Sequence, residues 1–308
     1  MAAACGLQSV RDVLLVSYFE GAIDDVEFTY DKFDLDGWDD AEYKVELRFD
    51  MSDLRVLLRT LRFPDRFVCS QRTVCSDFVY RTHQHRLNSS NQPFLNPRAL
   101  EHHAQSIHSR GAPLENCFGF VDGSLSKIAR PKNDQREVYN GHKRTHALKF
   151  QSVVLPNGLI ANLNGSYEER RHDAMILNES GLLRDLQAVA WANDRTPLCL
   201  YGDPAYPLGI HLQAPFRNVH TTPQMARFNE RMSDVRVAVE WMFGCVSNYY
   251  KFIEFQKQLQ IGLSPVGKLY LVCGILQNAH TCLHGNIVSD YFGVDHPKSC
   301  NLLLVRYR

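Results

Sequence analysis

The sequence predicts an α/β fold in which a sheet carries the functional residues and a small helical region precedes it. Two apolar segments each end on an acid beside a glycine, at Phe118–Asp122 and Leu198–Asp203. This is the pattern of buried strands that finish at the edge of a sheet. A hairpin pattern lies between them and long helical stripes follow, and this alternation of strands and helices is typical of an α/β domain.

Composition places the chain among globular proteins. Its 308 residues are 44% hydrophobic and 22% charged, with zero formal net charge. The nine cysteines contain no C-x-x-C pair, which favours reduced thiols over disulfides or a zinc ribbon. The longest apolar run, residues 269–276, is too short to span a bilayer, so no membrane association is expected.

The charges are unevenly distributed along the chain. Residues 20–50 hold twelve Asp or Glu against three Lys or Arg, whereas residues 122–149 hold seven Lys or Arg against three acids. An acidic arm and a basic strip therefore coexist at neutral total charge. The predicted organisation is an acidic N-terminal arm, a helical region, a strand-rich domain and a C-terminal tail, over residues 1–50, 51–112, 113–292 and 293–308.

The helical region contains three amphipathic patterns. Leu54–Leu61 stops before Pro64, and two further helices are expected over Phe78–Leu87 and Leu100–Ile107. No helix-turn-helix is readable among them.

The strand-rich domain begins with the Phe118–Asp122 strand and a basic loop over Ser124–Gly141. A hairpin follows, with strands over 146–155 and 159–163 around the turn Pro156-Asn157-Gly158. After the Leu198–Asp203 strand, Thr222-Pro223 starts a helix, with Thr as N-cap and Pro at the first helical position. Between the hairpin and that strand, a helix capped by Asp173 is expected to run through Val189. The helix that starts at Thr222 carries a buried stripe, and a last helix carries a second one. The residues of the two stripes are Phe228, Met232, Val235, Val239, Met242 and Val246, and then Val266, Leu269, Val272, Leu276, Ala279 and Leu283.

This order of elements is that of the ribonuclease H-like fold, where the first and fourth strands are adjacent and parallel. Asp122 and Asp203 would then lie side by side at the edge where open α/β sheets place their sites. Glu240, at the margin of a buried helical stripe, could lean over the same edge. Carboxylates so close repel one another and persist with shared protons or divalent cations, and oxygen ligands suit Mg²⁺ or Mn²⁺. The structural alternative for each acid is a helix cap or a salt bridge.

Short motifs around these acids resemble those of DDE-superfamily endonucleases, most closely the PIF/Harbinger transposases and the nucleases derived from them. The resemblance covers roughly residues 113–292, and it rests on four acidic motifs in order, Asp122-Gly123-Ser124, Arg171-His172-Asp173, Gly202-Asp203-Pro204-Ala205-Tyr206-Pro207-Leu208 and Val239-Glu240-Trp241-Met242-Phe243-Gly244, with Tyr139-Asn140-Gly141-His142-Lys143 and Phe150-Gln151 between.

The resemblance implies a metal-dependent DNA endonuclease that hydrolyses phosphodiester bonds by a two-metal mechanism. Asp122, Asp203 and Glu240 would be catalytic and bind Mg²⁺ or Mn²⁺, and Asp173 is a fourth candidate ligand or else a plain helix N-cap. The alternative function is a domesticated module that binds DNA or a protein without cleaving. Nuclear location, with the cytoplasm as alternative, and a Myb-like DNA-binding partner follow from the same resemblance; the oligomeric state, including a homo-oligomer, stays open.

The basic strip is the predicted DNA-binding surface. Its cationic side chains would neutralise phosphates beside the first acid, while the alternative is an ordinary solvated loop. The candidate residues are Lys127, Arg130, Lys132, Arg136, Lys143 and Arg144.

Overall fold

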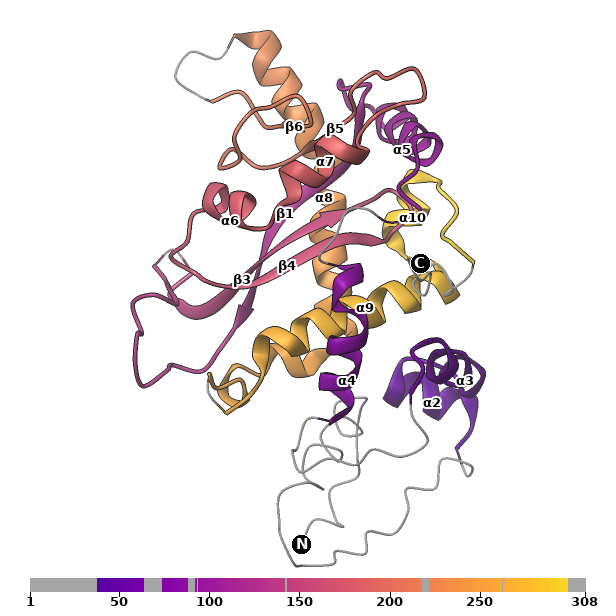
Figure 1. Ribbon diagram of the computed structural model, residues 1–308, viewed down its shortest axis with the longest axis vertical. Coiled ribbons are helices and arrows are strands. Elements are labelled where there is room, and N and C mark those ends of the chain that lie inside the picture. The colour runs from indigo at the N-terminus through magenta and orange to yellow at the C-terminus, as the bar shows by residue number, and fades with distance from the viewer. Residues whose placement is uncertain are drawn as a thin grey trace, which may run out of the picture. The chain divides into compact units, whose positions relative to one another are not determined.

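The computed structural model describes residues 38–63, 74–87, 92, 94–141, 143–217, 222–261 and 263–298 (Figure 1). Most of the predicted acidic arm, most of the predicted C-terminal tail, and His142 of the quoted motif lie outside the described residues. The chain divides into two compact units, Met1–His83 and Gln84–Arg308.

The described part of the first unit contains the helices α2 (Asp40–Leu47), α3 (Met51–Thr60) and α4 (Val74–His83). The acids at the starts of α2 and α3 form capping boxes, in which Asp39 pairs with Glu42 and Asp50 with Asp53. The part of the predicted acidic arm that is described is therefore helical, because its acids satisfy the free N–H groups of helix N-termini. Buried apolar side chains of this unit are Tyr43, Leu47, Phe49, Leu57, Leu61 and Val79.

The second unit is built on a mixed sheet (Figure 1). Its strands are β1 (Cys117–Lys127), β2 (Tyr139–Asn140), β3 (Thr145–Val154), β4 (Ile160–Glu168), β5 (Cys199–Tyr201) and β6 (Leu212–Gln213). The strand order is β2-β3-β1-β5-β6, and β4 pairs with β3. β1 is antiparallel to β3 and parallel to β5. This pairing confirms the predicted ribonuclease H-like arrangement, in which the Phe118–Asp122 and Leu198–Asp203 strands are adjacent and parallel.

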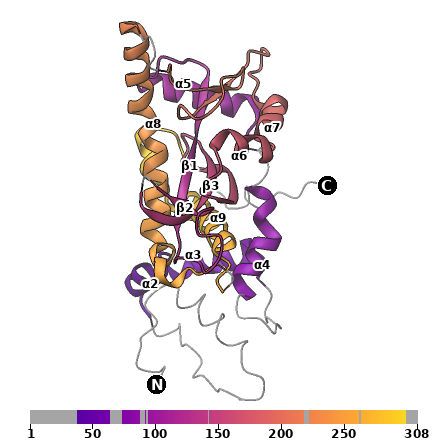
Figure 2. The same cartoon turned by 90° about the vertical axis from the view of Figure 1, so that its left-hand side faces the viewer.

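Helices cover both faces of the sheet. On one face, α5 (Pro97–Ser109), α6 (Asp173–Glu179) and α7 (Leu182–Val189) contribute Leu100, Leu177 and Leu186 to a cluster with Phe118 and Val121 of β1. On the other face lie α8 (Pro223–Tyr249), α9 (Val266–His284) and α10 (Ile287–Phe292). Figure 2 shows α8 on one side of the strands and α6 and α7 on the other. Short 3₁₀ helices are η2 (Gln84–Arg86), η3 (Lys251–Glu254) and η4 (Gln256–Gln258).

Two local predictions differ from the structure, and a third is confirmed. β1 continues past Asp122 to Lys127, because Ser124 and Ser126 are buried and pair with β3, so the start of the predicted basic loop is strand. The single helix expected after Asp173 is two helices, because Gly181 takes a left-handed conformation (φ 71°) between them. The helix at Thr222 is as predicted, with the Thr222 hydroxyl accepting from the N–H of Met225.

The sheet is joined to α9 by one buried amide. Asn278 accepts a hydrogen bond from the N–H of Ile160 and donates one to its carbonyl, both at 2.8 Å. We expect Asn278→Leu to lower the free energy of unfolding by about 3 kcal/mol, because two buried backbone groups lose their partners. Chemical denaturation measures the change. A loss below about 0.5 kcal/mol would show that these groups find other partners.

Among the described helices, none combines the length and the apolar character needed to cross a membrane.

Candidate active site

Asp122 lies in β1 opposite Ser152 of β3, and both of its carboxylate oxygens have partners. Oδ1 accepts the backbone N–H of Gly123 at 2.8 Å. Oδ2 accepts Nη1–H of Arg236, from α8, at 2.6 Å. The Asp122 and Arg236 side chains are only 17% and 20% exposed, so this charge-assisted bond is better shielded from solvent than a surface pair.

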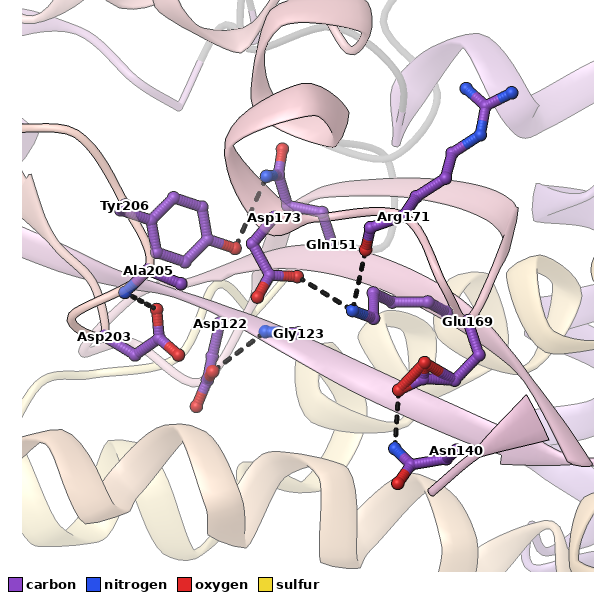
Figure 3. Close-up of polar contacts among 11 residues, drawn as sticks. Asp122, Gly123, Asn140, Gln151, Glu169, Arg171, Asp173, Asp203, Ala205 and Tyr206 are labelled. Atoms are coloured by element: carbon purple, nitrogen blue, oxygen red, sulfur yellow. Dashed lines mark hydrogen bonds and ion pairs between the residues drawn. The ribbon is translucent and has the colours of Figure 1, made fainter. Parts of the chain in front are cut away.

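Asp203 follows β5 and lies near Asp122, as the parallel pairing of β1 and β5 predicts. Its Oδ1 accepts the N–H of Ala205 at 2.9 Å. Burial raises the pKa of Asp122, and the charge of Asp203 raises it further, while Arg236 and the Gly123 N–H oppose the shift. Burial likewise raises the pKa of Asp203, opposed by the Ala205 N–H and increased by the charge of Asp173. Figure 3 shows the three carboxylates turned toward a common space.

Asp173 is the first residue of α6, not its N-cap. The cap position is His172, and no side chain makes a capping hydrogen bond there. The predicted capping alternative is therefore wrong. Instead, Asp173 Oδ1 lies 3.4 Å from Nζ of Lys149, which also donates to the carbonyl of Arg171 (Figure 3).

Glu240 is on α8, one turn after Arg236, and its side chain is 62% exposed. It meets the other acids through Arg236, whose Nη2 is 3.9 Å from Glu240 Oε1. Among the described residues, no three His, Cys, Asp or Glu side chains form a group that could hold a metal ion as they stand. The structure thus brings Asp122, Asp173 and Asp203 into electrostatic range, and it connects Glu240 to them through a guanidinium.

Buried polar side chains support the loop after β5. The Ser180 hydroxyl donates to Gln151 of β3 at 3.0 Å. Gln151 in turn donates to the Tyr206 hydroxyl at 3.4 Å (Figure 3). Burial raises the pKa of Tyr206, with the nearby acids adding to the shift, so this phenol stays neutral. Gln151 and Tyr206 belong to the motifs that carry the family resemblance, but no local pattern predicted a role for either side chain.

Two cations of the site have partners that local patterns did not predict. Lys149 was predicted as one cation of the basic strip, yet its side chain is 14% exposed and pairs with Asp173. Arg236 precedes Glu240 by four residues, a helical spacing that predicts an ion pair between them, and the structure places the two groups 3.9 Å apart. The bond from Arg236 to Asp122 was not predicted.

The six predicted DNA-binding side chains are all exposed, and none makes an ion pair with a described residue. Their segment begins where β1 ends, at Lys127, and not directly beside Asp122. Lys127 is five residue steps along the strand from Asp122, or about 16 Å at ~3.3 Å per step. Their DNA-binding role stays a prediction.

The chemistry of the acids fits a hard divalent cation. Carboxylate oxygens are the ligands that Mg²⁺ and Mn²⁺ prefer. Burial is the main cause of the raised pKa values of Asp122 and Asp203, and repulsion from a neighbouring acid adds to each of them. A guanidinium already offsets the charge of Asp122. Positive charge is therefore favoured at this position.

The fold and these acids define a class of protein: a ribonuclease H-like domain with one acid within β1 and another just after the parallel strand β5. Residues 121–278, which make up half of the chain, match the family described as DDE superfamily endonuclease. The chain therefore belongs to the DDE superfamily endonuclease family. The match spans Asp122, Asp173, Asp203 and Glu240. No curated protein and no solved structure matches the chain.

Replacing Asp203 with Asn tests the electrostatic cost of this cluster. An acid whose pKa is raised by folding binds its proton more tightly when folded, so its ionised form opposes folding above that pKa. We expect Asp203→Asn to raise the melting temperature in EDTA by roughly 2 °C at neutral pH. The gain should shrink as the pH falls through the raised pKa. A lower melting temperature at neutral pH would show that the Asp203 charge stabilises the fold.

Proposed function

We propose that this protein is a divalent-metal-dependent DNA endonuclease of Harbinger-type transposase origin. The observation that carries the proposal is that Asp122, within β1, and Asp203, just after the adjacent parallel strand β5, lie within electrostatic range of each other in a chain of the DDE superfamily endonuclease family. Endonucleases of this superfamily generally use divalent metals, and the substrate class is DNA.

In this proposal Asp122, Asp203 and Glu240 hold the metal, with Asp173 as a further ligand. When bound, a pair of such ions supplies an activated water and stabilises the leaving oxygen. Gly123 and Ala205 orient the first two carboxylates through their N–H groups. Lys149 holds Asp173 at the same sheet edge. Gln151 and Tyr206 keep the loop after β5 in place.

A plasmid-nicking assay tests the proposal. Supercoiled plasmid is incubated with the full chain in Mn²⁺, in Mg²⁺ and in EDTA. We expect open-circular product with either metal and none in EDTA. No nicking in any metal, from protein that is folded by circular dichroism, would contradict the proposal.

A second candidate function is a domesticated module that binds DNA or a protein without cleaving. The observation in its favour is that Arg236, and not a further carboxylate, meets Asp122 Oδ2. The same assay separates the two functions, because a binding module retards plasmid on a gel and leaves it supercoiled in Mn²⁺.

The basic segment is proposed to contact the DNA backbone about five base-pair steps from the cleaved bond, given ~16 Å along the strand and 3.4 Å per step. If three or four of its cations engage phosphates, log affinity should fall with log salt at a slope near −3. We expect Lys127→Gln with Lys143→Gln to reduce that slope by about 2.

Fluorescence anisotropy on unrelated duplexes at several salt concentrations gives the slope. The matched control is Arg184→Gln on α7, whose side chain is 84% exposed, and it should leave the slope unchanged. A flat salt response, or strong preference of the chain for one duplex, would place DNA recognition elsewhere.

The proposal also includes a Myb-like DNA-binding partner and a nuclear location. Backbone contacts alone give non-specific binding, with dissociation constants of about 10⁻⁴–10⁻⁶ M at physiological salt. Sequence readout then has to come from a second protein or from a further copy of this chain.

A further inference from the structure

Arg236 connects two of the acids that the proposed function assigns to the metal. Its Nη1 donates to Asp122 Oδ2 at 2.6 Å, and its Nη2 lies 3.9 Å from Glu240 Oε1. Asp122 is on β1 and Glu240 is on α8, so one guanidinium spans the space between the sheet and the helix. The side chain is 20% exposed, which sets it apart from the solvated arginines of the surface.

The bond to Asp122 uses the oxygen that a metal would need. Oδ1 of Asp122 already accepts the N–H of its neighbour Gly123 at 2.8 Å. That leaves Oδ2 as the oxygen directed away from the backbone, and Oδ2 accepts Arg236. A guanidinium and a divalent cation both seek the lone pairs of a carboxylate oxygen, so they compete for this position.

The charges of the surrounding residues explain why a cation belongs there. The charge of Asp203 acts on Asp122, and that of Asp173 acts on Asp203. Lys149 offsets Asp173 at 3.4 Å, and Arg236 offsets Asp122. In the metal-free site, the guanidinium of Arg236 is therefore the cation in direct contact with Asp122.

We propose that Arg236 is the counter-ion of the metal-free site, and that it withdraws from Asp122 toward Glu240 when a divalent cation binds. Arg236 is then a positioning residue that sets the metal affinity of the site. The inference rests on the proposed function, because it assumes that Asp122 is a metal ligand. A guanidinium released from Asp122 keeps a partner, since Glu240 is one helical turn away.

Metal titration of the full chain tests the inference. The probe is Mn²⁺, with binding followed by the electron paramagnetic resonance signal of the free ion. We expect Arg236→Gln to bind Mn²⁺ about tenfold more tightly than wild type, because a charge-assisted hydrogen bond no longer competes for Oδ2. Arg236→Lys, which keeps the charge without the planar fork, should fall between them.

The matched control is Arg231→Gln. Arg231 is on the exposed face of the same helix and makes no ion pair with a described residue. Its replacement removes the same charge from α8 and should leave the Mn²⁺ affinity within about twofold of wild type, since long-range effects of exposed charges are screened.

Thermal unfolding gives a second readout that separates positioning from a purely structural role. In EDTA we expect Arg236→Gln to melt below wild type, because Asp122 loses its partner. Saturating Mn²⁺ should then raise the melting temperature of the variant more than that of wild type. A deficit of the same size with and without Mn²⁺ would indicate an ordinary structural salt bridge and overturn the inference.

The outcomes for the two proposals are distinguishable. Wild-type protein that binds no Mn²⁺ would overturn the proposed function, and this inference with it. Wild-type protein that binds Mn²⁺, with equal or weaker binding by Arg236→Gln, would overturn the role of Arg236 alone. If Arg236→Gln does not fold, Arg236→Lys decides, because unchanged affinity in that variant contradicts competition at Oδ2.

Discussion

Replacing Asp122 with Asn is expected to lower metal-dependent nicking by more than about a hundredfold while the fold is retained. Asn has nearly the same volume, and its Oδ1 can still accept a hydrogen bond from Gly123 or Arg236. It lacks the charge that a hard cation requires of its ligand. Replacing residues that merely orient a ligand already costs about 10–100-fold, so loss of a ligand itself should cost more. Plasmid nicking in Mn²⁺ measures the effect.

The control for this experiment is Asp194→Asn. The carboxylate of Asp194 accepts the N–H of Thr196 in an exposed turn, and the acid has no place in the proposed site. Wild-type nicking by this variant would show that loss of one negative charge is not sufficient. Full nicking by Asp122→Asn, with unchanged circular dichroism, would contradict the assignment of Asp122 as a metal ligand and favour the non-cleaving module.

Replacing Glu240 with Gln is expected to have a comparable effect on nicking and almost none on stability. Its side chain is 62% exposed, and its contact with Arg236 is long, at 3.9 Å. Exposed pairs of this kind contribute about 0–1 kcal/mol, so the metal-free protein should unfold within roughly 0.5 kcal/mol of wild type. Nicking should fall more than about a hundredfold if Glu240 closes over the metal.

Denaturation in EDTA and nicking in Mn²⁺, performed on the same preparation, read the two effects separately. A large drop in stability would make Glu240 a structural partner of Arg236. Retained nicking would leave Asp122, Asp173 and Asp203 as the metal ligands, which is the set that the structure already brings together.

The main strands and the strand order could be predicted because local pattern and topology agree. Apolar segments that end on an acid and a glycine are recognisable as strands, and the hairpin turn at Asn157-Gly158 determines how β3 and β4 pair. The exact ends of the strands were harder to predict. Ser124 and Ser126 look like loop residues, yet they are buried in β1, because pairing with β3 continues to Lys127.

The partners of the acids could not be predicted in the same way. Lys149 looks like one of several cations in a basic strip, but its position on β3 takes it to Asp173. Asp173 looks like a helix cap, but His172 takes the cap position, and the Asp173 carboxylate pairs with Lys149 of β3 instead. Pairings between distant segments depend on register and helix rotation, which local patterns do not contain.

The sequence by itself determined the class of fold, the family resemblance, and the candidate acids Asp122 and Asp203, because these follow from hydrophobic period and from short motifs. Only the tertiary structure decided which charges meet. It placed Arg236 against Asp122 from a helix 114 residues away in the chain. It also left the carboxylate of Glu240 largely in solvent. The packing of α8 against the sheet determines both the position of Arg236 and the exposure of Glu240, because the rotation of the helix about its axis selects which side chain reaches the acids.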